Sequence, residues 1–163
     1  MKRFQNPRQL ASATPKEIEE LIRPLGIEKR RSITLYRFGL AVTKQFQSKI
    51  PRSRDALLTL PGVGEYAADA VRSLVTGDRL PMVDRNAVRV VTRIFSIDLP
   101  PNQRKATRVV RKFMLPLVRR HGAKNINLGL LDFAATVCTA RRPKCSGCVM
   151  RDFCQYTQNE PDR

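Results

Sequence analysis

The sequence has 163 residues, of which 31 are Lys or Arg and 14 are Asp or Glu, so its formal net charge is +17 at pH 7. A hydrophobic fraction of 42% excludes a disordered basic tail and is enough for one domain or two small lobes. No stretch approaches the roughly 18 consecutive apolar residues of a membrane-spanning helix, so we expect no membrane partner. A folded, strongly basic chain instead predicts a polyanionic partner, most often nucleic acid, although a ribosomal-type structural binder also fits the charge.

Nearly all of the chain has the apolar periodicity of helices, taken here in chain order. Thr14 and Glu17 form a capping box, with Pro15 at the first helical position, for a helix that ends at Gly26. Pro51 and Ser53 open a short helix, and Asp84 is the expected cap of the helix over residues 85–95. The remaining pattern predicts helices over residues 29–46, 51–58, 65–75, 85–95, 102–121 and 128–137. Since no segment alternates as a strand does, we predict an all-α fold.

A short turn, Leu60-Pro61-Gly62-Val63-Gly64, lies between two of the expected helices. Its glycines allow the backbone to approach a ligand closely, and the helix that follows offers free N–H groups and the positive end of its dipole. Such a helix-hairpin-helix can bind a DNA phosphate through Gly62, Val63 and Gly64 without using a side chain. An ordinary turn between packed helices explains the same residues, and the turn alone does not separate the two interpretations.

All four cysteines fall in one short segment, at Cys138, Cys145, Cys148 and Cys154. The first residues of the chain lack the apolar core of a secretory signal, so we expect a reducing, cytoplasmic compartment in which structural disulfides are uncommon. Four thiolates that include a CxxC pair can surround zinc or a [4Fe–4S] cluster, and frequency alone favours zinc. The loop after the first cysteine carries three cations that suit either phosphate contacts or a solvated loop, namely Arg141, Arg142 and Lys144.

Two further side chains are candidates for chemistry. Tyr66 directly follows the turn, and Asp84 stands at a helix start, where a carboxylate at a cleft can activate water or stabilise a cationic sugar. A core aromatic and a plain helix cap are the structural explanations of the same two residues. In the expected 102–121 helix, Arg104, Arg108 and Arg111 share one face, which is either a backbone-binding stripe or a solvated surface.

Together, the turn Leu60–Tyr66, the segment Val83–Val90 and the C-x6-C-x2-C-x5-C spacing resemble the endonuclease III/MutY superfamily of DNA glycosylases. The resemblance covers essentially the whole chain. It implies two helical lobes, residues 1–80 with the helix-hairpin-helix and residues 81–163 with the cysteine loop, and an active cleft between them. It also implies a [4Fe–4S] cluster in place of zinc, and it places the catalytic aspartate of the family at Asp84.

The residue at position 66 distinguishes the subfamilies, because endonuclease III has a lysine there that forms a Schiff base, which a phenol cannot do. Tyr66 and the segment Asn127–Phe133 are most similar to archaeal-type thymine-DNA mismatch glycosylases. The resemblance therefore implies a monofunctional, monomeric, nucleoid-associated enzyme that removes thymine or uracil opposite guanine from duplex DNA. In that reading Leu128 fills the gap left by the flipped base. Some MutY relatives also carry Tyr at this position, so an adenine glycosylase remains an alternative.

The beginning of the chain departs from the family pattern. Judged by the resemblance, relatives carry further N-terminal helices, which line the pocket and hold the glutamate that MutY-type enzymes use on adenine. We therefore expect Met1 to fall inside the third helix of the family. A non-catalytic DNA-binding remnant, which kept the turn and the cysteines, is a second alternative.

Overall fold

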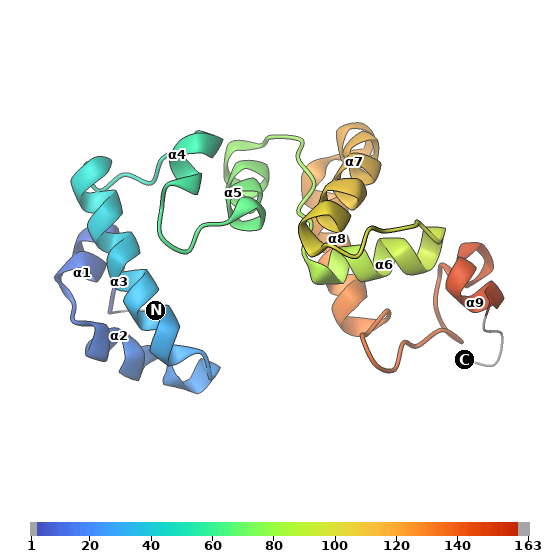
Figure 1. Ribbon diagram of the computed structural model, residues 1–163, viewed down its shortest axis with the longest axis horizontal. Coiled ribbons are helices and arrows are strands. Elements are labelled where there is room, and N and C mark those ends of the chain that lie inside the picture. Colours follow the sequence, from blue (N-terminus) through green and yellow to red (C-terminus); the bar gives the residue numbers. More distant parts are fainter. Residues whose placement is uncertain (1–2, 160–163) are drawn as a thin grey trace. The chain divides into compact units, whose positions relative to one another are not determined.

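The structure, a computed structural model, describes residues 3–159, and every regular element within that range is a helix (Figure 1). The predicted all-α fold is thus confirmed. The chain divides into two compact units, Met1–Ala68 and Asp69–Arg163, while the division into functional lobes at residues 80 and 81 stays a prediction. Among the described residues, no helix has both the length and the apolar character needed to cross a bilayer.

The first unit consists of short helices around one long helix. Its elements are α1 (Pro7–Ser12), α2 (Pro15–Ile22), the 3-10 turn η1 (Arg23–Leu25), α3 (Glu28–Gln45), α4 (Arg54–Leu58) and the beginning of α5 (Glu65–Val71). The predicted capping box is present, since Glu17 N donates to Thr14 Oγ1 at 3.2 Å and Thr14 N donates to the Glu17 carboxylate at 2.8 Å. The bond from the Thr14 backbone is the main cause that lowers the pKa of Glu17 below its ordinary value.

The core of the first unit forms where α1 and α2 pack on α3 (Figure 1). Its buried side chains are Ala13, Ile18 and Ile22, against which Phe4, Leu10, Leu35 and Tyr36 pack. Gly39 of α3 permits this packing, because a Cβ there would lie 2.8 Å from the backbone nitrogen of Ala11. The absence of a side chain at position 39 therefore sets how closely α1 approaches α3.

The second unit is built around α6. It contains the π-helical turn η2 (Arg72–Thr76), α6 (Arg85–Phe95), α7 (Gln103–His121), α8 (Ala123–Thr136), the 3-10 turn η3 (Arg151–Phe153) and α9 (Gln155–Asn159). On one side of α6, Ala87 and Val91 join a cluster with Val110 and Met114 of α7. On the other side, α6 joins a second cluster that includes Val90, Ile94, Ala134, Cys138 and Cys154. The helix that follows Asp84 is thus fixed by apolar burial on two sides.

Most of the predicted helices are confirmed to within a few residues, with three differences. The helix predicted to start at residue 128 starts at Ala123, because the polar side chains in its first turns hid the apolar periodicity. The helix predicted over residues 65–75 changes from α to π geometry at Arg72. The short helices α1 and α9 were not predicted, although Asn6 caps α1 and Pro7 opens it, which is a sequence-level start signal.

Candidate functional site

The predicted turn at Gly62 and Gly64 is exposed, and its two glycines differ in what they permit. Gly62 has a left-handed φ of 78°, and a Cβ there would collide with the methyl group of Thr34, so the fold itself requires this glycine. Gly64 has open space where a Cβ would stand. Its missing side chain leaves the backbone at the start of α5 open to close approach by a ligand. Val63 N closes the turn by donating to Leu60 O at 3.1 Å.

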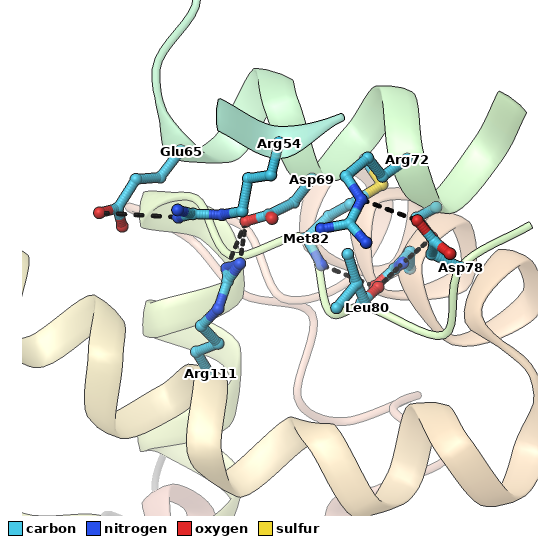
Figure 2. Close-up of polar contacts among 10 residues, drawn as sticks. Arg54, Glu65, Asp69, Arg72, Asp78, Leu80, Met82 and Arg111 are labelled. Atoms are coloured by element: carbon cyan, nitrogen blue, oxygen red, sulfur yellow. Dashed lines mark hydrogen bonds and ion pairs between the residues drawn. The ribbon is translucent and has the colours of Figure 1, made fainter. Parts of the chain in front are cut away.

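Cationic side chains lie beside this turn. Arg31 Nη1 of α3 lies 4.0 Å from the position that a Cβ of Gly62 would take, and Arg31 is exposed. Arg54 of α4 pairs with Glu65 of α5 at 3.9 Å, as Figure 2 shows. Arg31 carries no signal of this role in the sequence, because about thirty residues separate it from the turn and only the fold brings them together.

Tyr66 and Asp84 occupy the positions that the sequence predicted, each at the start of a helix. Tyr66 lies in the first turn of α5, in the first unit, and is 37% exposed. Asp84 lies in the second unit as the N-cap of α6: its Oδ1 accepts from Ala87 N at 2.8 Å and its Oδ2 accepts from Asn86 Nδ2 at 2.8 Å. These two bonds hold the carboxylate in one orientation, and Asp84 remains partly accessible.

Within the second unit, the end of α5 and α7 share an ion pair whose carboxylate is buried. Asp69 of α5 is fully buried, and its Oδ2 accepts from both terminal nitrogens of Arg111 on α7 (Figure 2). Arg111 was expected to share a cationic stripe with Arg104 and Arg108, which are exposed. It instead neutralises Asp69, so the stripe that remains accessible is shorter than the sequence pattern indicates.

The four cysteines line one cavity in the second unit. None of the four forms a disulfide; Cys138, Cys145 and Cys154 are buried, whereas Cys148 is half-buried. Burial, followed by the proximity of the other three thiols, raises the pKa of Cys145. Four sulfurs gathered in a largely apolar pocket repel one another as thiolates, and bound metal supplies the positive charge that stabilises them. The donor set therefore fits a thiolate-ligated metal centre.

The backbone around the cysteines is held by two arginines of α6, neither of which the sequence analysis assigned a role. Arg93 Nη1 donates to Thr139 O at 2.7 Å and lies 3.5 Å from Cys138 Sγ, and its Nη2 donates to Ala140 O at 3.0 Å. Its guanidinium carbon lies 4.8 Å from the centre of the Tyr156 ring. Arg93 thus fixes the start of the loop between the first two cysteines.

The second arginine, Arg89, closes the end of α8. Its Nη2 donates to Ala134 O at 3.0 Å and to Cys138 O at 3.0 Å. Carbonyls at a helix C-terminus lack partners within the helix, and a cation there also complements the helix dipole. The first cysteine is therefore attached to α6 through its backbone.

The loop between the first two cysteines presents the three cations that the sequence singled out. Thr139 Oγ1 donates to Arg142 O at 2.6 Å, and Lys144 N donates to Val137 O at 2.9 Å, so the backbone of the loop is folded. The side chains of Arg141, Arg142 and Lys144 are exposed. Leu128, the predicted wedge, lies on α8 and is 36% exposed, which is high for a large apolar side chain.

Two protein-family models match this chain, one over the hairpin and one over the cysteines. The helix-hairpin-helix motif matches residues 45–74, and the iron-sulfur binding domain of endonuclease III matches residues 138–154. The matched domain spans all four cysteines, so Cys138, Cys145, Cys148 and Cys154 are the ligands of a [4Fe–4S] cluster, and the expectation drawn from the resemblance is confirmed.

Similarity also extends along the whole chain. The thymine/uracil-DNA glycosylase of Pyrobaculum aerophilum is 40% identical over 161 residues, which cover 97% of this chain and 70% of that protein. The adenine DNA glycosylase of Mycolicibacterium smegmatis is 35% identical over 142 residues, covering 86% of this chain and 47% of that protein. The solved structure of a thermostable thymine-DNA glycosylase superimposes with a TM-score of 0.85 at 32% identity, over 97% of this chain and 72% of that one. The chain therefore belongs to the endonuclease III/MutY superfamily of helix-hairpin-helix DNA glycosylases.

Proposed function

We propose that this protein is a monofunctional DNA glycosylase of base-excision repair that removes thymine or uracil opposite guanine. The observation that carries the proposal is the 40% identity, over 97% of the chain, to a thymine/uracil-DNA glycosylase. The partly accessible carboxylate of Asp84 and the cationic surface supply the chemistry that this activity needs.

Binding to the duplex depends first on charge. The exposed cations of the cysteine loop, Arg141, Arg142 and Lys144, contact phosphates, and the hairpin receives a further phosphate at Gly62–Gly64 with Arg31 beside it. The target nucleotide leaves the base stack and reaches Asp84, while Leu128 occupies the gap left in the duplex.

Base removal is a hydrolysis in which Asp84 is the catalytic residue. The bond between C1′ of the deoxyribose and N1 of the base breaks, and the base leaves with the electron pair and takes up a proton. The carboxylate of Asp84 stabilises the positive charge that develops on the sugar, and it accepts the proton of the water whose oxygen bonds to C1′. The bonds from Ala87 N and Asn86 Nδ2 hold the carboxylate in place throughout.

Tyr66 accounts for the absence of strand cleavage. Its phenol cannot form the Schiff base that a lysine forms, so the abasic strand is released uncut. Tyr66 packs against the flipped base and contributes to its selection. The bound cluster supplies a rigid connection between four points of the chain, and Arg89 and Arg93 attach that region to α6, the helix that Asp84 caps.

The test is a single-turnover assay of the purified, cluster-containing protein on duplexes with one G·T, G·U or G·A mismatch. We expect release of thymine and uracil, strand breakage only after alkali treatment, and no enzyme–DNA adduct with borohydride. Release of no base from any of the three duplexes, with the iron content intact, contradicts the proposal.

Similarity to adenine DNA glycosylases makes removal of adenine the second candidate. The same assay separates the candidates, because adenine release from G·A without thymine or uracil release favours this one. Tight binding of mismatched duplexes without release of any base instead identifies a DNA-binding remnant.

A further inference from the structure

The carboxamide of Asn127 lies at a three-way contact inside the second unit, and its side chain is 1% exposed. Its Oδ1 accepts from Met82 N at 2.9 Å, and its Nδ2 donates to Ser73 Oγ at 2.9 Å and to Leu80 O at 2.8 Å. Figure 2 shows Leu80 and Met82 at this contact. The two backbone partners determine which end of the amide is oxygen, because Met82 N–H can only donate and Leu80 C=O can only accept.

These bonds join three parts of the chain. Asn127 belongs to α8 and Ser73 to the π-helical turn η2, whereas Leu80 and Met82 belong to a segment, residues 78–84, without regular secondary structure. A buried backbone outside helices and sheets needs partners from elsewhere. Asn127 supplies them on both sides of Pro81, one to the carbonyl before it and one to the amide after it.

The segment that Asn127 holds leads directly to Asp84. Met82 and Val83, the two residues before Asp84, are each 4% exposed, so the chain is buried in the second unit up to Asp84. On the far side of Asp84, α6 fixes the carboxylate through Ala87 N. The position of the carboxylate therefore depends on two constraints, the N-terminus of α6 and the amide of Asn127.

We propose that Asn127 is a positioning residue that sets where the carboxylate of Asp84 stands. The proposal rests on the proposed function, in which Asp84 is the catalytic carboxylate. Leu128 is the next residue along α8, so the same contact also fixes the backbone of the wedge residue relative to Asp84. A displacement of about 1 Å in a reacting group slows a reaction about 100-fold, whereas it leaves distant phosphate contacts unchanged.

The decisive comparison is between Asn127→Leu and Ser73→Ala in the cluster-containing protein. Asn127→Leu replaces the amide by an apolar group of similar size and removes all three bonds. Ser73→Ala is the matched control, because it removes one bond to the same amide and keeps both bonds to residues 78–84. We expect Asn127→Leu to excise thymine from a G·T duplex about 100-fold more slowly than wild type. Its duplex binding and iron content should match wild type, and Ser73→Ala should excise at close to the wild-type rate.

Hydrogen–deuterium exchange gives a readout that is independent of activity. In Asn127→Leu, peptides covering residues 78–84 should exchange faster, while peptides of α7 keep their protection. Asn127→Asp keeps the acceptor for Met82 N and loses both N–H donors. Its exchange rate at residues 78–84 should therefore lie between those of wild type and Asn127→Leu. This variant replaces Asn127→Leu in the experiment if Asn127→Leu does not fold.

Wild-type excision by Asn127→Leu, unchanged exchange at residues 78–84, or an equal loss of rate in Ser73→Ala would each overturn the inference. If the wild-type protein releases no base, the proposed function fails, and the exchange arm still decides whether Asn127 holds the segment before Asp84.

Discussion

At the scale of single residues, Asp84 caps α6, and its geometry is compatible with the catalytic role that we propose for it. Capping uses Oδ1, which accepts from Ala87 N, whereas Oδ2 accepts from a side chain, Asn86 Nδ2, at the exposed end of α6. A carboxylate has more lone pairs than these two bonds occupy, so it can also face a reacting sugar. The cap orients the group, and the charge of the group serves the proposed chemistry.

The side chain at position 66 determines whether a Schiff base can form in the proposed reaction. Tyr66→Lys places an amine in the first turn of α5, at a position that is 37% exposed, so the fold should tolerate the change. We expect a covalent enzyme–DNA adduct after borohydride treatment, together with some strand nicking, since an amine can form the Schiff base that a phenol cannot. Tyr66→Phe is the control and should give neither product. Absence of the adduct in an active Tyr66→Lys protein would mean that residue 66 does not face the sugar.

The sequence predicted those residues whose role is local. The capping box of Thr14 and Glu17 and the cap at Asp84 are readable because their partners lie within three positions. The four cysteines are readable because all of them fall within residues 138–154. Arg93 and Asn127 were assigned no role, because Arg93 bonds to Thr139 and Asn127 bonds to Ser73, each across more than forty residues. An Arg or Asn on a predicted helix carries no signal of such a partner.

Among the elements of the second unit, the ion pair between the buried Asp69 and Arg111 joins the end of α5 to α7. Arg111→Met should lower the free energy of unfolding by about 3–5 kcal/mol, because it leaves the carboxylate of Asp69 buried without its cation. The double variant Asp69→Leu/Arg111→Met should recover most of that loss, since an apolar pair needs no charge compensation. Urea unfolding of the wild type and of the single and double variants measures these differences in the free energy of unfolding. Equal stability of Arg111→Met and wild type would show that the ion pair contributes nothing.

The loop between the first two cysteines is proposed to contact DNA phosphates through Arg141 and Arg142. Arg141→Ala/Arg142→Ala should weaken binding to every duplex and reduce the slope of log affinity against log salt by about one unit per lost contact. The control, Lys16→Ala/Arg23→Ala, removes the same charge from exposed positions of the first unit. Fluorescence anisotropy at several salt concentrations measures the slopes. Equal slopes for the two double variants would assign Arg141 and Arg142 to a solvated loop.

At the scale of the whole molecule, each unit contains an apolar core, and the four cluster ligands lie in the second unit. Cys138 and Cys154 are members of an apolar cluster with Val90 and Ile94 of α6, so loss of the metal removes part of that core. The core of the first unit, around Ile18 and Ile22, contains no cysteine. The stability of the second unit should therefore depend on iron more than that of the first.

Cys148→Ser tests this dependence. The wild-type protein, purified without oxygen, should be brown and contain about four iron atoms per chain, and Cys148→Ser should lose both the colour and the iron. Proteolysis of the variant should then cut within residues 138–154 first, while peptides of α3 stay protected. Cys148→Ser that keeps its iron, or a colourless active wild type that contains zinc, would refute the cluster assignment.

In the proposed function the carboxylate of Asp84 drives removal of thymine or uracil opposite guanine, and single-turnover excision by Asp84→Asn measures that role. Asn caps helices about as well as Asp, so the melting temperature and the affinity for a G·T duplex should stay close to wild type. We expect the rate of thymine release to fall about 100- to 1000-fold, because the charge that stabilises the sugar cation is gone. Release of thymine by Asp84→Asn at the wild-type rate would contradict it and would leave Asp84 with the role of a helix cap.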